Sequence, residues 1–239
     1  MRSGPRASQS LSNSRALREK KLLPLIIRIH RRNGSTVFQT LRITEAALCF
    51  ISLLATISGV SASTPTTVGN RLKELIREVP DFPKPGVNFY DITTLLKDKN
   101  GFRKTVDLLQ DHYRDKPIDV VVGIEARGYF FAPAMAHALG AGFVPVRKPK
   151  KLPHVVRSVD YVLEYGTDQL EMHADAIEPG QNVLIIDDVL ATGGTASAVA
   201  RLVQLAEGKV AGLGFVIELT FLKGRDKLHG FDIFSLMQY

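Results

Sequence analysis

Two adjacent carboxylates, Asp187 and Asp188, directly follow the apolar run 183–186. Adjacent acids at the end of a buried strand are costly unless they bind a partner, and successive side chains of a strand point to opposite sides. Carboxylates accept hydrogen bonds from hydroxyl groups and hold hard cations such as Mg²⁺. This pair therefore predicts a site for the hydroxyls of a sugar, with a hydrated magnesium ion nearby.

The residues after the acids are small and suit an anion. Ala191, Thr192, Gly193, Gly194 and Thr195 let backbone N–H groups converge on a phosphate, and the helix predicted next adds its positive end. A Gly-Gly pair alone is more often a tight turn, and a single Asp is often a helix cap. The complete order of strand, two acids, small residues and helix instead favours a sugar-phosphate site.

Two further segments carry positive charge at the ends of apolar runs. Residues 123–128, GIEARG, contain Arg127, whose guanidinium can make two parallel hydrogen bonds to a phosphate. The cluster after FVPV consists of Arg147, Lys148, Lys150 and Lys151. A solvated surface is the usual interpretation of such a run, and an ordinary ion pair is the alternative for Arg127. Their positions after strands favour the binding of a polyanion.

These residues need a scaffold that brings strand ends together. Short runs rich in Val and Ile, separated by helical patterns, predict buried parallel strands and an α/β fold with an open, mostly parallel sheet. Ligands of such sheets bind beyond the carboxyl ends of the strands. The predicted strands are 119–123, 143–146, 182–186 and 212–219, and the predicted helices are 70–79, 101–114, 131–139 and 196–206.

Two segments interrupt this pattern. In residues 80–91, PDFPKPGVNFYD, the prolines disfavour both helix and sheet pairing and predict a constrained loop. Residues 152–171 have weak apolar periodicity and predict a mobile lid that excludes water from the site.

Thiol and metal-cluster chemistry have little support. The single cysteine, Cys49, lies before the predicted domain, which excludes disulfides, zinc–thiolate clusters and cysteine nucleophiles within that domain. The six histidines are scattered without metal-ligand spacing. We therefore expect no metal bound directly by the protein, only Mg²⁺ held near Asp187 and Asp188 through substrate and water.

The first 67 residues differ in composition from the rest. Ten basic and two acidic residues give residues 1–67 a net charge of +8, so residues 68–239 carry −1 of the total of +7. A near-neutral domain behind a basic segment does not have the charge distribution of a nucleic-acid-binding protein. The Ser/Arg-rich, acid-poor composition predicts an organellar transit peptide or a disordered extension, followed by one domain over 68–239. A signal or anchor segment built on the uncharged residues 46–62, and an extension without a role, are the alternatives; we expect no stable membrane association.

The segment 183–195, VLIIDDVLATGGT, resembles the phosphoribosyl-pyrophosphate signature of type I phosphoribosyltransferases. Residues 72–239 are similar to the adenine phosphoribosyltransferase family, of a plant type with an N-terminal extension, in PDFPKPGVNFYDIT, GIEARGYFFAP, RKPKKLP, LEYGTDQLEMH and VIELTFLKGRDKL. The resemblance implies the type I phosphoribosyltransferase fold with a small hood and a lid. It also implies that N9 of adenine displaces pyrophosphate from C1′ of phosphoribosyl pyrophosphate to give AMP. The resemblance further implies Mg²⁺ as a cofactor, assembly into a homodimer and a cytoplasmic location. The location would instead be a plastid or a mitochondrion if residues 1–67 are a transit peptide.

The same resemblance assigns roles to single residues. Asp187 and Asp188 hold the ribose, Arg127 holds the pyrophosphate, and Glu164 acts as acid/base on a purine-ring proton; these are the implied catalytic residues. Phosphoribosyl pyrophosphate is further held by Glu125, Ala126, Gly128, Arg147, Lys148, Lys151, Tyr165, Ala191, Thr192, Gly193, Gly194 and Thr195. Adenine is held by Val87, Asn88, Phe89 and Leu219.

Two other functions stay open. Tyr90 stands where many relatives carry Arg or Gln, so hypoxanthine, xanthine, orotate or an adenine-like cytokinin base are alternative acceptors. A non-catalytic regulator that binds phosphoribosyl pyrophosphate on the same fold tends to lack the lid acid or the pyrophosphate arginine, whereas Glu164 and Arg127 are present. A P-loop kinase is excluded, because neither G-x-x-x-x-G-K-[ST] nor G-x-G-x-x-G occurs.

Overall fold

The computed structural model describes residues 23–30, 36–43, 71–162 and 167–239. The chain divides into two compact units, Met1–Ala62 and Ser63–Tyr239. The first unit contains an antiparallel hairpin of β1 (Leu23–His30) and β2 (Thr36–Ile43). This hairpin, which the sequence did not lead us to expect, lies within the predicted extension. The apolar stretch 46–62 lies outside the described residues, and none of the described helices is long and apolar enough to cross a membrane.

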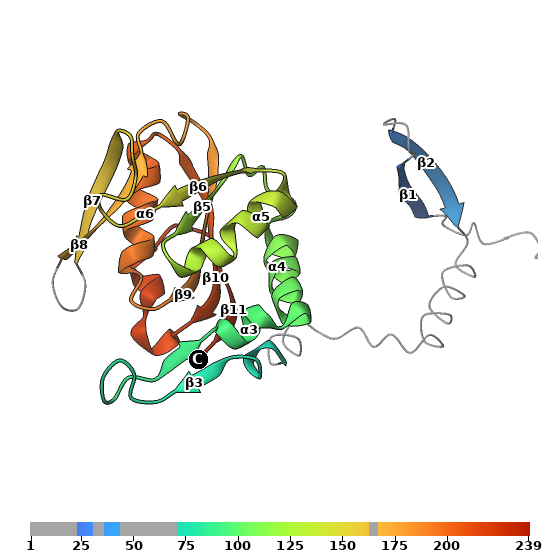
Figure 1. The fold of residues 1–239 in the computed structure, drawn as a ribbon. Helices are drawn as coiled ribbons and strands as arrows, with labels where there is room; N and C mark the ends of the chain where they lie inside the picture. Colours follow the sequence, from blue (N-terminus) through green and yellow to red (C-terminus); the bar gives the residue numbers. More distant parts are fainter. Residues whose placement is uncertain (1–22, 31–35, 44–70, 163–166) are drawn as a thin grey trace, which may run out of the picture. The chain divides into compact units, whose positions relative to one another are not determined.

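The second unit is built on a five-stranded sheet in the order β11-β10-β9-β5-β6. Every neighbouring pair is parallel, which confirms the predicted α/β fold (Figure 1). The strands are β5 (Val120–Ile124), β6 (Gly142–Val146), β9 (Asn182–Leu190), β10 (Lys209–Glu218) and β11 (Ile233–Gln238). The edge strand β11 was not predicted, and β9 continues past the predicted end at residue 186.

Helices cover both faces of this sheet. The helix α6 (Gly194–Leu205) lies on one face, and α4 (Lys99–Tyr113) and α5 (Ala132–Leu139) lie on the other (Figure 1). Alternate residues of β9 enter the two cores: Val183 and Ile185 pack with α6, whereas Leu184 and Ile186 pack with α4 and α5. Burial on both faces explains why the strand reads as an unbroken apolar run.

The helix predicted at 70–79 is wrong over most of its length. Among the described residues it ends at Lys73, and β3 (Arg77–Val79) instead pairs antiparallel with β4 (Phe89–Asp91). The pairing sets Arg77 opposite Asp91, and their side chains form an ion pair at 3.6 Å. The proline-rich segment is therefore a loop that closes a short ribbon, followed by α3 (Thr93–Lys97).

The segment predicted as a lid is largely a β-hairpin. The strands β7 (Val156–Val162) and β8 (Thr167–His173) pair antiparallel, and residues 163–166 lie outside the described part. Val159, Tyr161, Leu170 and Met172 are buried in the core beside α6. Their two-residue spacing within each strand is a β-pattern that the sequence contained and that the lid prediction overlooked.

Candidate active site

A cavity of about 260 Å³ lies at the carboxyl ends of β5 and β9. These strands are parallel neighbours, so their ends meet at one edge of the sheet. The cavity brings together both acids, the small residues after them, the GIEARG segment and one lysine of the basic cluster. Its lining residues are 124–127, Lys148, Tyr161, Leu170 and 187–196.

The two acids belong to β9 itself. The side chain of Asp188 is only 4% exposed, and its Oδ2 lies 2.9 Å from Nε of Arg127 in an ion pair. The backbone N–H of Asp188 donates to Oδ1 of Asp187 at 2.9 Å. Burial, together with the charge of Asp188, raises the pKa of Asp187 well above its usual range. Burial also raises the pKa of Asp188, although Arg127 opposes the shift. The pair therefore favours a partner that brings positive charge or hydroxyl donors.

Oδ2 of Asp188 has unused acceptor capacity. It is buried, yet it accepts no hydrogen bond from any residue that the structure describes. The ion pair with Arg127 compensates its charge but leaves this oxygen without a well-oriented hydrogen bond, which a hydroxyl or a metal-bound water could supply. Two carboxylates at a cavity wall also match the oxygen donors that Mg²⁺ prefers, so the residues present fit this ion.

The loop after the acids ends at the first turn of α6. Gly194, Thr195 and Ala196 line the cavity, and the first N–H groups of a helix have no partner inside it. No side chain caps this end, because the N-cap residue is Gly193 at φ 75°. The helix therefore presents backbone donors and its positive end to the cavity, as an anion requires.

A glycine that the sequence did not single out supports this loop. Gly224 begins the short helix η3 (Gly224–Lys227), which follows η2 (Thr220–Leu222). A Cβ on Gly224 would lie 2.2 Å from the carbonyl oxygen of Ala191, and one on Gly193 would lie 2.2 Å from that of Gly224. The two backbones can approach this closely only because both residues lack a side chain. The only sequence signal for this contact was the similarity of VIELTFLKGRDKL to the family pattern.

The GIEARG segment passes from β5 into η1 (Arg127–Phe130), and the peptide between Glu125 and Ala126 is cis. Gly128 was predicted to help hold phosphoribosyl pyrophosphate, but it is not among the residues that line the cavity. A Cβ there would instead lie 2.8 Å from the carbonyl oxygen of Ile186 and 3.0 Å from Oδ1 of Asp187. The glycine thus allows η1 to pack against β9, which sets Arg127 beside the acids.

Glu125 organises the basic cluster. Its carboxylate lies 2.6 Å from Nζ of Lys151 and 3.4 Å from Nη2 of Arg147, and it accepts from the N–H of Lys148 at 3.0 Å. Burial opposes its ionisation, but the hydrogen bonds from Lys151, Lys148 and Arg147 lower the pKa of Glu125 to about 2. Lys148 itself is paired with Asp168 and Tyr161. Arg147 and Lys151 are therefore held at Glu125, which lines the cavity, and Lys148 alone of the basic cluster is itself among the lining residues. The backbone N–H of Lys150 donates to Glu171 instead.

A second, apolar pocket of about 420 Å³ adjoins the first at Arg127. The guanidinium of Arg127 lies 5.3 Å from the ring centroid of Phe89, and the rings of Phe82 and Phe89 meet edge to face at 5.2 Å. A planar, weakly polar ligand can pack against such groups. The lining residues are Val79, Phe82, Phe89, Asp91, Ile92, Thr93, Arg127 and Phe130.

Of the predicted adenine residues, only Phe89 lines this pocket. The other three residues bond within the fold. The carbonyl oxygen of Val87 accepts from the N–H of Phe82, and the side-chain amide of Asn88 donates to the carboxylate of Glu78. The N–H of Leu219 donates to the carbonyl oxygen of Leu190. Neither described cavity includes those three among its lining residues.

Tyr90, the departure from the family pattern, lies outside the pocket wall. Its ring packs against that of Tyr239, with centroids 4.2 Å apart, while its strand neighbours Phe89 and Asp91 line the pocket. Glu164 and Tyr165, the predicted lid residues, lie outside the described residues. Their roles stay predictions.

Comparisons with known proteins agree with this geometry. A model of the phosphoribosyl transferase domain matches residues 91–229. The adenine phosphoribosyltransferase of Solibacter usitatus is 71% identical over 168 residues, which cover 70% of this chain and 97% of the relative. That of Acidobacterium capsulatum is 60% identical over the same length, with 70% and 93% covered.

Solved structures agree as well. The adenine phosphoribosyltransferase of Thermoanaerobacter pseudethanolicus matches with a TM-score of 0.70 and 50% identity, covering 72% of this chain and 99% of that one. The enzyme from Saccharomyces cerevisiae, solved with an imino-altritol bisphosphate and adenine, matches with a TM-score of 0.68 and 40% identity, covering 72% and 99%. By its acid pair, its glycine loop and these relatives, the chain belongs to the adenine phosphoribosyltransferase family of enzymes.

Proposed function

We propose that this enzyme transfers the 5-phosphoribosyl group of phosphoribosyl pyrophosphate to N9 of adenine, which yields AMP and pyrophosphate in purine salvage. One observation carries the proposal: the Asp187–Asp188 pair and the glycine loop form one cavity, and Arg127 joins that cavity to an aromatic pocket. A polar sugar-phosphate site beside a flat apolar site is the arrangement that two such substrates need.

The acid pair is proposed to hold the ribose, and the first turn of α6 the 5′-phosphate. Asp187 and Asp188 accept hydrogen bonds from the ribose hydroxyls, and their negative charge stabilises the positive charge that develops at C1′ as the pyrophosphate leaves. Mg²⁺, when bound near these residues through substrate and water, neutralises charge on the phosphates. The binding of positive charge keeps both carboxyls ionised, against the burial that raises their pKa values.

Arg127 and the cations around Glu125 are proposed to receive the pyrophosphate. Arg127 is 41% exposed at its side chain and can turn from Asp188 to a phosphate, which frees that carboxylate for the ribose. Glu125 keeps Arg147 and Lys151 beside the cavity, so it acts as a positioning residue. Lys148 lines the cavity and can exchange Asp168 for a phosphate oxygen.

Adenine is proposed to stack on Phe89, with its ring edge read by backbone groups. The ring of Phe89 supplies a flat surface in the apolar pocket, and the Arg127 guanidinium that lies over this ring moves to the pyrophosphate. Val87 and Asn88, in the proline-rich loop, are proposed to reach the base through backbone groups, and the side chain of Leu219 is proposed to cover the ring from the side opposite Phe89. Glu164 is proposed as the acid/base for a ring proton and Tyr165 as a further contact to phosphoribosyl pyrophosphate; both rest on the family resemblance.

A homodimer is also proposed. Phe130 and Phe143, on η1 and β6, are 46% and 38% exposed. Exposed aromatic side chains of this size are enriched at subunit interfaces. Light scattering on the purified chain should give twice the mass of one chain.

The location is proposed to be cytoplasmic, or a plastid or mitochondrion if residues 1–67 are removed on import. N-terminal sequencing of the mature protein distinguishes these locations.

The decisive experiment incubates the folded protein with adenine, phosphoribosyl pyrophosphate and Mg²⁺ and follows AMP and pyrophosphate. Hypoxanthine and an adenine-like cytokinin base serve as competing acceptors, and adenine should give the highest kcat/KM. Binding of phosphoribosyl pyrophosphate without any product would instead indicate a regulator. No product and no binding, from protein with a cooperative thermal transition, would overturn the proposal.

A further inference from the structure

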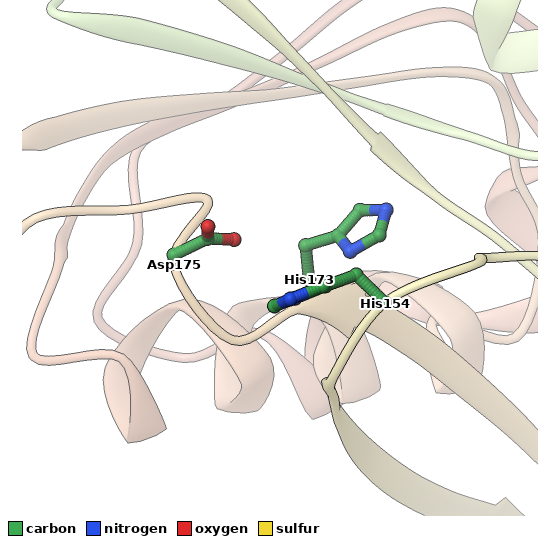
Figure 2. Close-up of side chains that lie close together, drawn as sticks. All are labelled: His154, His173 and Asp175. Carbon is green, nitrogen blue, oxygen red and sulfur yellow. The ribbon is translucent and has the colours of Figure 1, made fainter.

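The fold brings together three side chains that lie apart in the sequence and that the proposed reaction does not use. His154 precedes β7, His173 is the last residue of β8, and Asp175 lies in the turn that follows (Figure 2). One ligand atom from each lies within 4.8 Å of the others. The hairpin register explains the meeting: Val156 pairs with His173, and the N–H of Ala174 donates to the carbonyl oxygen of Val155.

These side chains have no other engagement. In the part of the chain that the structure describes, none of the three side chains forms a hydrogen bond or an ion pair, and the two imidazoles meet at a centroid distance of 6.3 Å. His112 shows the contrasting case, because it pairs with Asp232 and stacks on Phe234 at 4.1 Å. A histidine used for packing has partners of this kind, whereas His154 and His173 keep their nitrogen atoms available.

Two imidazoles and one carboxylate form a ligand set suited to a zinc-class ion. Zn²⁺ accepts nitrogen and oxygen ligands at about 2.0–2.2 Å in tetrahedral geometry, often with water as the fourth ligand. Tetrahedral bonds of that length place ligand atoms about 3.3 Å apart, so the present cluster has to contract by roughly 1.5 Å at most. His154 and Asp175 are exposed and lie outside the strands, so these are the residues that can make this movement.

We propose that His154, His173 and Asp175 bind one Zn²⁺-class divalent ion at the base of the β7–β8 hairpin. The site is distinct from the cavity at Asp187 and Asp188, since none of its residues lines that cavity. The two sites also differ in chemistry. Mg²⁺ prefers a set of oxygen ligands, whereas imidazole nitrogen is a ligand that suits Zn²⁺. A bound ion ties the start of β7 to the end of β8 and so stabilises the hairpin that covers α6.

The test uses the full chain without an affinity tag, at a pH about one unit above the ordinary histidine pKa of ~6.5. Saturating Mg²⁺ first occupies oxygen sites, and Zn²⁺ is then titrated by calorimetry. Co²⁺ serves as a spectroscopic substitute, since tetrahedral coordination gives intense visible absorption. The variants are His154→Ala and His173→Ala, with His229→Ala as the matched control, because His229 lies outside the cluster.

We expect one zinc-class ion per chain in the wild type and in His229→Ala. Each cluster variant should weaken binding at least tenfold, because even the loss of an outer-shell partner costs about 10–100-fold in affinity. Zinc should also raise the Tm of the wild type, at concentrations about 100-fold above the Kd, but not that of the cluster variants. Equal zinc binding by all three variants, or no zinc binding by the wild type, would overturn the proposal. The metal-free Tm of each variant should match the wild type, which separates loss of the site from loss of the fold.

Discussion

The polar cavity around Asp187 and the apolar pocket around Phe89 share Arg127 but are built in different ways. Most of the cavity wall comes from one continuous segment, 187–196, at the end of a central strand. The pocket wall comes from the segment 79–93, which spans β3, the proline-rich loop, β4 and the start of α3, and from Arg127 and Phe130 of η1. The sugar-phosphate half of the site thus follows one strand end, whereas the base half depends on the pairing of β3 with β4 and on the packing of η1 beside them.

The largest effect is expected from the acids that define the polar cavity. Asp188→Asn removes a buried charge next to Arg127 and to the proposed ribose site. Loss of one preorganised electrostatic group of this kind lowers kcat by about 10²–10³. Steady-state rates of AMP formation measure the effect. Asp160→Asn, on the strand β7 and away from the cavity wall, is the control and should retain wild-type kcat; an equally active Asp188→Asn variant would remove the acid pair from catalysis.

The next effect tests whether the phosphate loop depends on its neighbour. Gly193→Ala combines a φ of 75° with overlap against Gly224, whereas Gly224→Ala creates overlap with Ala191 and with the side chain of Leu190 but has no positive φ. Both displace the loop, so KM for phosphoribosyl pyrophosphate should rise about tenfold or more, since one ångström of misplacement can cost ~100-fold. KM for adenine should change less, because its pocket lies on the other side of Arg127.

Gly180→Ala is the matched control for this pair. Gly180 has a φ of 85°, and a Cβ at this position would have no atom within 4 Å, so the substitution tests backbone strain without overlap. It should lower stability by about 1 kcal/mol and leave KM unchanged. If Gly180→Ala and Gly224→Ala had the same kinetics, close approach of the two backbones would not be what positions the loop.

The two halves of the site also differ in how far the sequence could predict them. The acids, the glycine loop and Arg127 were predicted, because each follows an apolar run and strand ends meet in a parallel sheet. Gly224 could not be found this way. It supports the phosphate loop through a close backbone contact, and Gly193 of that loop lies 31 positions earlier in the chain. The pairing of Arg147 and Lys151 with Glu125 was missed as well, because Glu125 lies at the end of a different strand.

The errors have a common physical cause. Residues 77–79 contain the end of a good helical pattern, yet they pair with β4, so a tertiary contact overrode the local preference. The strands β7 and β8 were taken as a lid because each strand shows its two-residue period at only two buried apolar positions, Val159 and Tyr161 in one and Leu170 and Met172 in the other. His154 and His173 have no metal-ligand spacing in the sequence, and only the hairpin register brings them together.

A smaller effect is expected in the apolar pocket. Phe89→Leu keeps an apolar side chain but removes the ring that faces Arg127. Loss of an aromatic contact costs about 0.5–1.5 kcal/mol, so KM for adenine should rise roughly 2–10-fold. KM for phosphoribosyl pyrophosphate should stay constant. Phe221→Leu, at a side chain that is 65% exposed and outside both pockets, is the control. A rise in KM for the phosphate substrate alone would assign Phe89 to the polar half instead.

The smallest effect distinguishes Glu125 from Asp187, two acids of the same cavity. Their charges are expected to change the free energy of unfolding in opposite directions. The pKa of Glu125 is lowered to about 2, so its charge stabilises the fold above the ordinary pKa of 4.5, and this stability is lost as the pH falls through 2. Glu125→Gln should therefore lower the free energy of unfolding at neutral pH by about 1 kcal/mol, a modest value because Arg147 and Lys151 are partly exposed. Tm should fall by about 2–4 °C, and the difference from wild type should shrink below pH 4.5.

Asp187 should behave in the opposite way. Its pKa is raised, so its charged form destabilises the fold above that pKa, and protonation recovers the stability as the pH falls towards 3.8. Asp187→Asn should then raise Tm at neutral pH while lowering kcat, and the gain should disappear on acidification. Thermal unfolding of both variants from neutral to acidic pH measures the two signs. The fold itself stabilises the charge of Glu125, whereas the charge of Asp187 is stabilised only when a ligand binds. If both variants shifted Tm in the same direction, Glu125 and Asp187 would not differ in this respect.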